Sequence, residues 1–225
     1  MPKRAEPFIN GFIYHVYNKA IEGRKIFVDP SINHRFLDIL QYYRSSNTRL
    51  SYSRFIRFDD SLQNVLLKKL LIKKHFRVHI LCFCMMPTHF HLLIKQAKIG
   101  GISQFIADIT NSITRFYNLK YDRKGPLFFP RFQSVRIASD EQLWHVSRYI
   151  HLNPYSSKIV SGMDECESYL WSSLHLYLDS RKNDGLCSTS KLLHAFKDIS
   201  LYRIFVKDQA EYQRSLEEIK HVKNW

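Results

Sequence analysis

The chain has 225 residues, 45% of them hydrophobic, and its 34 Lys and Arg against 20 Asp and Glu give a net charge of +14. This length and hydrophobic content support one sizeable core and exclude a disordered chain. The positive charge is typical of a protein that binds a polyanion, and the 16 Phe and 13 Tyr interleaved with it suit stacking on unpaired bases.

The four cysteines show no secreted-type spacing, and the N-terminal residues lead into no apolar signal core. No uncharged apolar stretch approaches the length of a membrane span. We therefore expect a cytoplasmic protein without membrane attachment.

The first elements alternate between strand and helix patterns. Residues 12–17 are β-favouring and predict a buried strand. A helix capped by Ser31 is expected to extend to about Tyr43, and a second helix is expected to begin at Asp60 with apolar residues on one face.

The centre of the chain reads as a β-hairpin. Residues 78–86 and 89–94 are rich in apolar and β-favouring types, and Pro87-Thr88 between them fits a tight turn. Because side chains alternate along a strand, His89 and His91 share one face and can offer two imidazoles to a single ion. A His-x-His pair is equally compatible with ordinary strand histidines.

Cysteines near this pair leave a zinc site open as an alternative. Cys82, Cys84, His89 and His91 form a C-x-C-x₄-H-x-H run, and a two-residue turn would place Cys84 opposite His91 on the same face. The other interpretation is that both cysteines fill the core.

The next segments carry basic residues beside aromatic ones. A helix is expected over 102–119, a loop over 120–130, and a strand over 131–137. We expect DNA contacts from five basic side chains on these segments and on the helix that follows. They are Arg123, Lys124, Arg131, Arg136 and Arg148.

A helix should follow the strand. Ser139 with Gln142 three residues later matches a capping box, so the helix should begin near Asp140, and Pro154 should end it. Tyr149 and Asn153 stand four residues apart on this helix and therefore on one face. Residues 179–190 read as a polar linker, and 191–223 as a charged helical segment.

Four motifs together resemble those of the single-tyrosine HUH transposases, and more narrowly the branch associated with repetitive extragenic palindromes. The motifs are Tyr14-His15-Val16-Tyr17-Asn18-Lys19, Met86-Pro87-Thr88-His89-Phe90-His91, Gly125-Pro126-Leu127-Phe128 with Arg131-Phe132-Gln133-Ser134, and Tyr149-Ile150-His151-Leu152-Asn153-Pro154. They occur in the family's order, and the similarity covers residues from about 8 to 178.

The resemblance implies a fold and a set of site residues. The fold is α+β, a ferredoxin-like antiparallel sheet flanked by helices, over residues 1–180, with a helical C-terminal extension over 181–225. By the match of motifs, His89, His91 and Asn153 become metal ligands and Tyr149 the nucleophile. The residues that follow Asn153-Pro154 depart from the family pattern, which weakens any basic contact carried over from that turn.

These roles agree with elementary chemistry. A tyrosine hydroxyl, with a pKa of about 10, is a poor nucleophile at neutral pH, so phosphoryl transfer needs help at the transition state. Two imidazoles and an amide oxygen suit Mg²⁺ or Mn²⁺ as Lewis acid.

The expected activity is cleavage and rejoining of single-stranded DNA near hairpins or palindromes through a 5′-phosphotyrosine, by a monomer or homodimer. The alternatives are a domesticated, non-catalytic protein that binds palindromes and an RNA-binding module.

Overall fold

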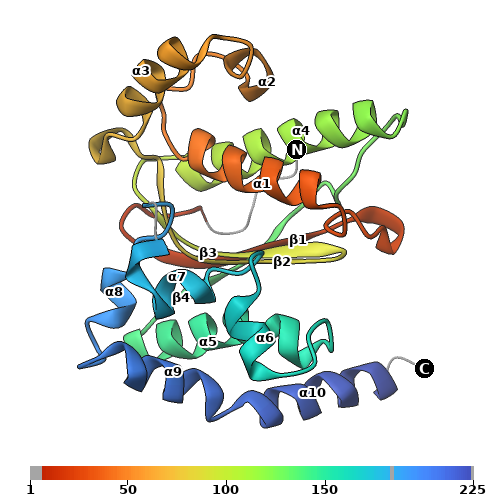
Figure 1. Cartoon of the computed structure of the whole chain (residues 1–225), viewed down its shortest axis with the longest axis vertical. Helices are drawn as coiled ribbons and strands as arrows, with labels where there is room; N and C mark the ends of the chain where they lie inside the picture. Colours follow the sequence, from red (N-terminus) through yellow and green to blue (C-terminus); the bar gives the residue numbers. More distant parts are fainter. Residues whose placement is uncertain (1–6, 183–184, 224–225) are drawn as a thin grey trace.

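The computed structural model describes residues 7–182 and 185–223 and contains a four-stranded antiparallel sheet with the strand order β2-β3-β1-β4. The strands are β1 (Ile13–Lys19), β2 (Val78–Met86), β3 (His89–Gln96) and β4 (Gln133–Ile137). Helices cover both faces of the sheet (Figure 1). The order of elements and strands is that of a ferredoxin-like fold, so the predicted α+β class is confirmed.

One face of the sheet packs on α1 (Pro30–Tyr43) and α4 (Gly101–Lys120). The predicted cap of α1 is wrong by two residues, because the side chain of Asp29 accepts the hydrogen bond from the Ser31 backbone N–H and Pro30 opens the helix. Proline suits this first position, where its missing N–H leaves no bond unmade.

Between α1 and β2 the chain forms a helical segment that lies on the side of α1 and α4 away from the sheet (Figure 1). It contains α2 (Tyr52–Phe55), α3 (Asp60–Leu70) and the 3-10 turn η2 (Lys73–His75). The predicted apolar face of α3 is only partly covered, since Leu70 is buried but Val65 is 47% exposed.

The other face of the sheet packs on α5 (Asp140–Ser156) and on the helices that follow it. The remaining elements are η1 (Ile21–Gly23), α6 (Met163–Ser168), α7 (Leu174–Leu178), η3 (Ser180–Lys182), α8 (Ser190–Leu193), α9 (Ile199–Lys207) and α10 (Ala210–Lys223). Within 7–182 and 185–223, no helix has the length and apolar content to cross a bilayer.

The segment expected as a polar linker is attached to the core. Leu186 and Cys187 are buried, and the Ser188 backbone N–H donates to the Ile80 carbonyl at 2.8 Å. Arg44 donates to the carbonyl of Leu186 at 3.0 Å. The described part of the C-terminal extension therefore packs on the sheet and on α5, and the division at residue 180 stays a prediction.

Helix α5 begins as predicted but ends later. The Gln142 backbone N–H donates to Ser139 Oγ at 3.1 Å, and Gln142 Oε1 accepts from the Ala138 N–H at 2.7 Å. The predicted stop at Pro154 is wrong, because Pro154 lies inside the helix, which continues to Ser156. Proline lacks one helical hydrogen bond, but the last turn is buried and its packing compensates for that loss.

Candidate active site

The β2–β3 hairpin places His89 and His91 on the sheet face that α5 covers. Antiparallel pairing sets Met86 opposite His89 and Cys84 opposite His91, so the turn lies at Pro87-Thr88 as predicted. The two imidazole centroids are 4.9 Å apart. His91 is 5% exposed.

Strand β1 adds a third histidine and a tyrosine to this face. Tyr17 pairs with His91, and its ring centroid lies 5.5 Å from the His91 imidazole. His15, two residues earlier on the same face, has its Nε2 atom 2.9 Å from His91 Nδ1. One of these two nitrogens carries the shared proton, so the bond sets the orientation of His91 and directs its Nε2 away from His15.

Helix α5 brings Tyr149 over the histidines. The half-buried Tyr149 ring lies edge-on to His91 and His15, with centroid separations of 5.8 Å and 6.0 Å. All three residues belong to one chain. Within one chain, the fold therefore brings the predicted nucleophile beside one predicted metal ligand.

Asn153 lies one turn after Tyr149 and is 3% exposed. Its amide nitrogen donates to the Tyr149 backbone carbonyl at 2.8 Å. Gln213 of α10 donates to the same carbonyl at 3.1 Å. Because the Asn153 nitrogen is committed to the helix, the atom that this residue can offer to a metal ion is Oδ1.

The protein environment keeps two of the imidazoles neutral. Burial lowers the pKa of His15 to about 4. Burial, reinforced by the positive charge of Lys19 and opposed by the negative charge of Glu217 on α10, lowers the pKa of His89 to about 4. Neutral imidazole is the form that binds metal, so His89 is held in the protonation state that a divalent ion requires. Imidazole nitrogens and an amide oxygen are ligand types that suit such an ion.

The two cysteines of the alternative zinc run are core residues. Cys84 and Cys82 are fully buried, and burial holds the pKa of the Cys84 thiol well above its usual range. The Cys84 sulfur contacts the Met86 sulfur at 3.7 Å. Among the residues that the structure describes, no three His, Cys, Asp or Glu side chains are grouped as metal ligands.

Two of the basic residues expected to contact DNA are engaged within the protein. The Arg123 guanidinium donates to Asn118 Oδ1 at 3.0 Å and to the Pro126 carbonyl at 2.7 Å, which closes the loop after α4. Arg148 donates to the Phe205 carbonyl at 3.2 Å and joins α5 to α9. DNA contact by either residue stays a prediction.

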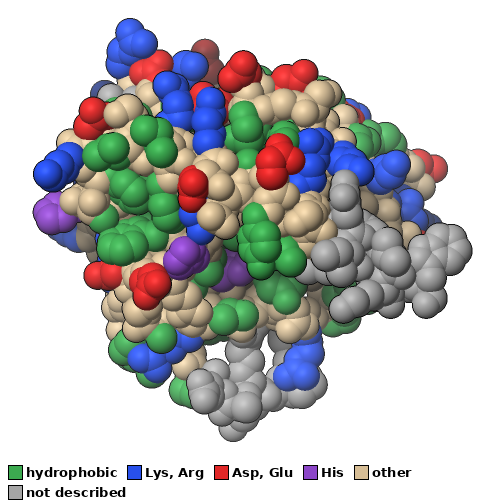
Figure 2. Space-filling view, turned by 90° about the horizontal axis from the view of Figure 1, so that it is seen from below, with side chains coloured by type: hydrophobic (Ala, Val, Ile, Leu, Met, Phe, Trp, Pro, Cys, Tyr) green, Lys and Arg blue, Asp and Glu red, His purple; other side chains and the backbone are tan. Residues whose placement is uncertain are grey.

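The other three are exposed. Lys124 and Arg131 are exposed on the loop before β4, and Arg136 is exposed on β4 with its guanidinium 3.9 Å from the centre of the Phe12 ring. On the face that α10 crosses, Lys and Arg side chains lie around the margin with Asp and Glu among them (Figure 2). Positive charge is therefore not concentrated at the centre of that face.

Analysis of the sequence missed His15 and Tyr17 as site residues. The alternation along residues 12–17 does place them on one face, which is the signal that was available. That this face is the one bearing His91 depends on the register between β1 and β3, which no local pattern specifies.

Two comparisons with known proteins gave matches. The model of a family described as IS200-like transposases matches residues 10–153, a range that runs from just before β1 to Asn153. A solved structure described as a REP-associated tyrosine transposase bound to a REP hairpin is 14% identical, with a TM-score of 0.48, over 78% of this chain and 84% of that chain. A search of curated proteins found no match.

Proposed function

Because the chain belongs to the IS200-like transposase family, we propose that it cleaves and rejoins single-stranded DNA with Tyr149 as the nucleophile. The observation that carries the proposal is the approach of the Tyr149 ring to His91, 5.8 Å between centroids, within one chain. The DNA expected is a strand with a hairpin or palindrome, on the resemblance of the sequence motifs and the net charge of +14.

The covalent step exchanges one phosphoester bond for another. The Tyr149 oxygen attacks the phosphorus, the bond from phosphorus to the 3′ oxygen breaks, the phenol proton passes to water, and the leaving oxygen takes a proton. The product is a 5′-phosphotyrosine with a free 3′ hydroxyl on the other fragment. Attack by a 3′ hydroxyl on the phosphotyrosine reverses the step, so rejoining needs no nucleotide cofactor.

The residues that would hold a divalent ion are His89, His91 and Asn153. Such an ion supplies Lewis-acid stabilisation of the charge on the phosphoryl group. His15, with a pKa of about 4, is a poor acceptor for the phenol proton, and its role is to orient His91 through their shared hydrogen bond. Asn153, bonded to the Tyr149 carbonyl, lies on the turn of α5 that follows the proposed nucleophile.

Covalent trapping tests the proposal. Hairpin DNA labelled at its 3′ end is incubated with the protein and Mn²⁺ or Mg²⁺, and the label is expected to migrate with the protein on a denaturing gel. Tyr149→Phe keeps the ring and removes the attacking oxygen, so the adduct should disappear while hairpin affinity persists. If the unaltered protein formed no adduct with any hairpin and either ion, a protein that binds palindromes without cutting would be the better interpretation.

A further inference from the structure

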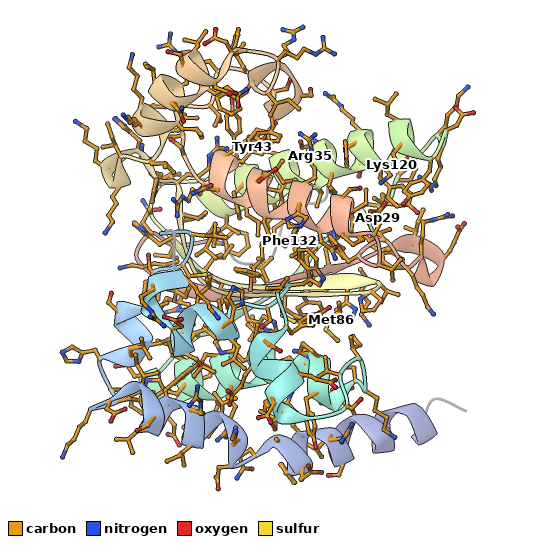
Figure 3. All side chains as sticks on the ribbon, in the orientation of Figure 1. Asp29, Arg35, Tyr43, Met86, Lys120 and Phe132 are labelled. Carbon is orange, nitrogen blue, oxygen red and sulfur yellow. The ribbon has the colours of Figure 1, made fainter. Side chains whose placement is uncertain are left out.

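A cavity of about 630 Å³ lies on the opposite side of the sheet from Tyr149, between α1, α4 and the chain segment around α2. Figure 3 shows Arg35 and Tyr43, which line the cavity from α1, above the sheet, and Met86 below it. Met86 pairs with His89 at the candidate active site. The cavity is therefore separate from the site that holds the nucleophile.

The lining of the cavity is strongly basic. Five arginines contribute to it, and the acidic residue among the described lining residues is Asp108. Asp108 is already paired, since its carboxylate accepts from the buried guanidinium of Arg77 at 2.7 Å. The arginines are Arg35, Arg49, Arg57, Arg77 and Arg115.

Three of these arginines have their charge available. Arg49, Arg57 and Arg115 are exposed, and none of them forms an ion pair with another residue of 7–182 or 185–223. Guanidinium groups around one hollow repel one another, and a bound anion removes that repulsion. Arginine also presents paired N–H donors that match the oxygens of a phosphate.

Aromatic surface accompanies the charge. The Arg35 guanidinium lies 4.4 Å from the centre of the Phe116 ring and 4.9 Å from that of Tyr52. Half-buried Phe116 also lines the cavity, as does Tyr43, of which only 8% is exposed. Planar guanidinium and aromatic groups of this kind stack on unpaired bases.

The size of the cavity limits its occupant. Its volume falls in the range of roughly 300–1,000 Å³ that is typical of pockets for small ligands. A double helix, which is wider than its own major groove of about 12 Å, cannot be enclosed by such a hollow. A single unpaired nucleotide with its phosphates can.

We propose that this cavity is a second DNA-binding site, which takes an unpaired nucleotide and its flanking phosphates from the single-stranded part of the DNA substrate. The proposal rests on the proposed function, because it assigns the strand held here to the molecule that Tyr149 cleaves. The cavity holds the strand at a distance from the reacting phosphate and so positions the hairpin on the protein.

A charge-removal variant tests the site. Arg49→Gln, Arg57→Gln and Arg115→Gln are combined, and binding of a fluorescent hairpin with single-stranded flanks is measured by anisotropy at several salt concentrations. We expect affinity to fall at least about tenfold at 0.1 M salt, and the slope of log affinity against log salt to shrink by about two, since each contact to a single strand contributes about 0.7. The matched control combines Lys182→Gln, Lys191→Gln and Lys197→Gln, three exposed cations of the C-terminal part.

A cross-link locates the bound nucleotide. Leu119 lines the cavity and is 85% exposed. The fold should therefore tolerate a benzophenone amino acid at this position, and the benzophenone should reach the bound DNA. Cross-links are expected to the single-stranded flank and to be lost when the flank is removed. Equal affinities and salt slopes in the two triple variants, or cross-links confined to the stem, would overturn the proposal.

The adduct assay separates this proposal from the proposed function. In the arginine variant, the DNA concentration that gives half the maximal adduct should rise in step with the lost affinity, because the cavity binds the substrate while Tyr149 and the histidines lie on the other side of the sheet. Cross-linking from Leu119 together with no adduct in the unaltered protein would overturn cleavage and keep the cavity as a DNA-binding site. An adduct in the unaltered protein, with no cross-link from Leu119 to any flank, would keep cleavage and overturn the cavity as a DNA-binding site.

Discussion

His15 Nε2 lies 2.9 Å from His91 Nδ1, and the two residues come from strands that are 76 positions apart in the chain. A hydrogen bond to the second ring nitrogen of a metal-binding histidine holds the ring in place and selects the nitrogen that faces the metal. His15 is thus a positioning residue for His91 in the proposed site.

We expect His15→Ala to lower the affinity for Mn²⁺ by about 10-fold to 100-fold, the loss typical when such a partner is removed. Titration calorimetry on the purified variant measures this directly. His15→Gln, which can still hydrogen-bond to His91, should recover part of the affinity. The control is His194→Ala, an exposed histidine after α8; unchanged Mn²⁺ affinity in His15→Ala would contradict the positioning role.

Tyr17 is a rival to Tyr149, because its ring lies 5.5 Å from His91, against 5.8 Å for Tyr149. The family resemblance favours Tyr149, so Tyr17→Phe should keep the covalent adduct within about threefold of the unaltered yield, while Tyr149→Phe should lose it. Adduct yield on a denaturing gel, measured for both variants side by side, distinguishes the two. Loss of the adduct in Tyr17→Phe alone would transfer the nucleophilic role to β1.

Replacing His89 or His91 by alanine should abolish cleavage and leave hairpin affinity within about threefold, since a bound ion stabilises the transition state more than the complex. Addition of a chelator to the unaltered protein should have the same effect and be reversed by excess Mn²⁺. Anisotropy and adduct yield are measured on the same preparations, with His34→Ala as the control. Equal cleavage with and without chelator would exclude the proposed metal site.

Stability should decrease in mild acid, because buried histidines resist protonation in the folded chain. His151 is fully buried between Tyr202 and Ser173, at 2.8 Å and 2.9 Å, and burial lowers its pKa to about 3. His15 and His89 have pKa values of about 4. The unfolded chain takes up these protons near pH 6.5, so the free energy of unfolding should fall as pH drops from about 6.5 to 4.

The expected slope is at most about 1.4 kcal/mol per pH unit for each such histidine. Urea unfolding at pH 7.5, 6 and 5 measures it. His151→Gln removes one titrating group, so the slope should become shallower even though the variant starts from a lower stability. A free energy of unfolding that stays constant over this range would show that these side chains are not held neutral by the fold.

Local patterns in the sequence were sufficient to predict individual helices and strands. The alternation in residues 89–94 puts both histidines of the His-x-His pair on one face, and the capping pair Ser139 and Gln142 gives the start of α5. These features depend on neighbours within about four residues, which is the range over which strand and helix geometry repeat. The order of the motifs also led to the ferredoxin-like fold, through resemblance to a family.

Tertiary packing decided the rest. Pro154 stays helical because the end of α5 is buried, and Asp29 caps α1 in place of the predicted Ser31. The site itself arises from pairing β1 with β3 and laying α5 across both, which brings His15 and Tyr149 to His91. The sequence by itself predicted His89, His91, Tyr149 and Asn153 as site residues and the strand face that the two histidines share. Only the tertiary structure decided which faces meet, because strand register and helix docking depend on contacts between residues far apart in the chain.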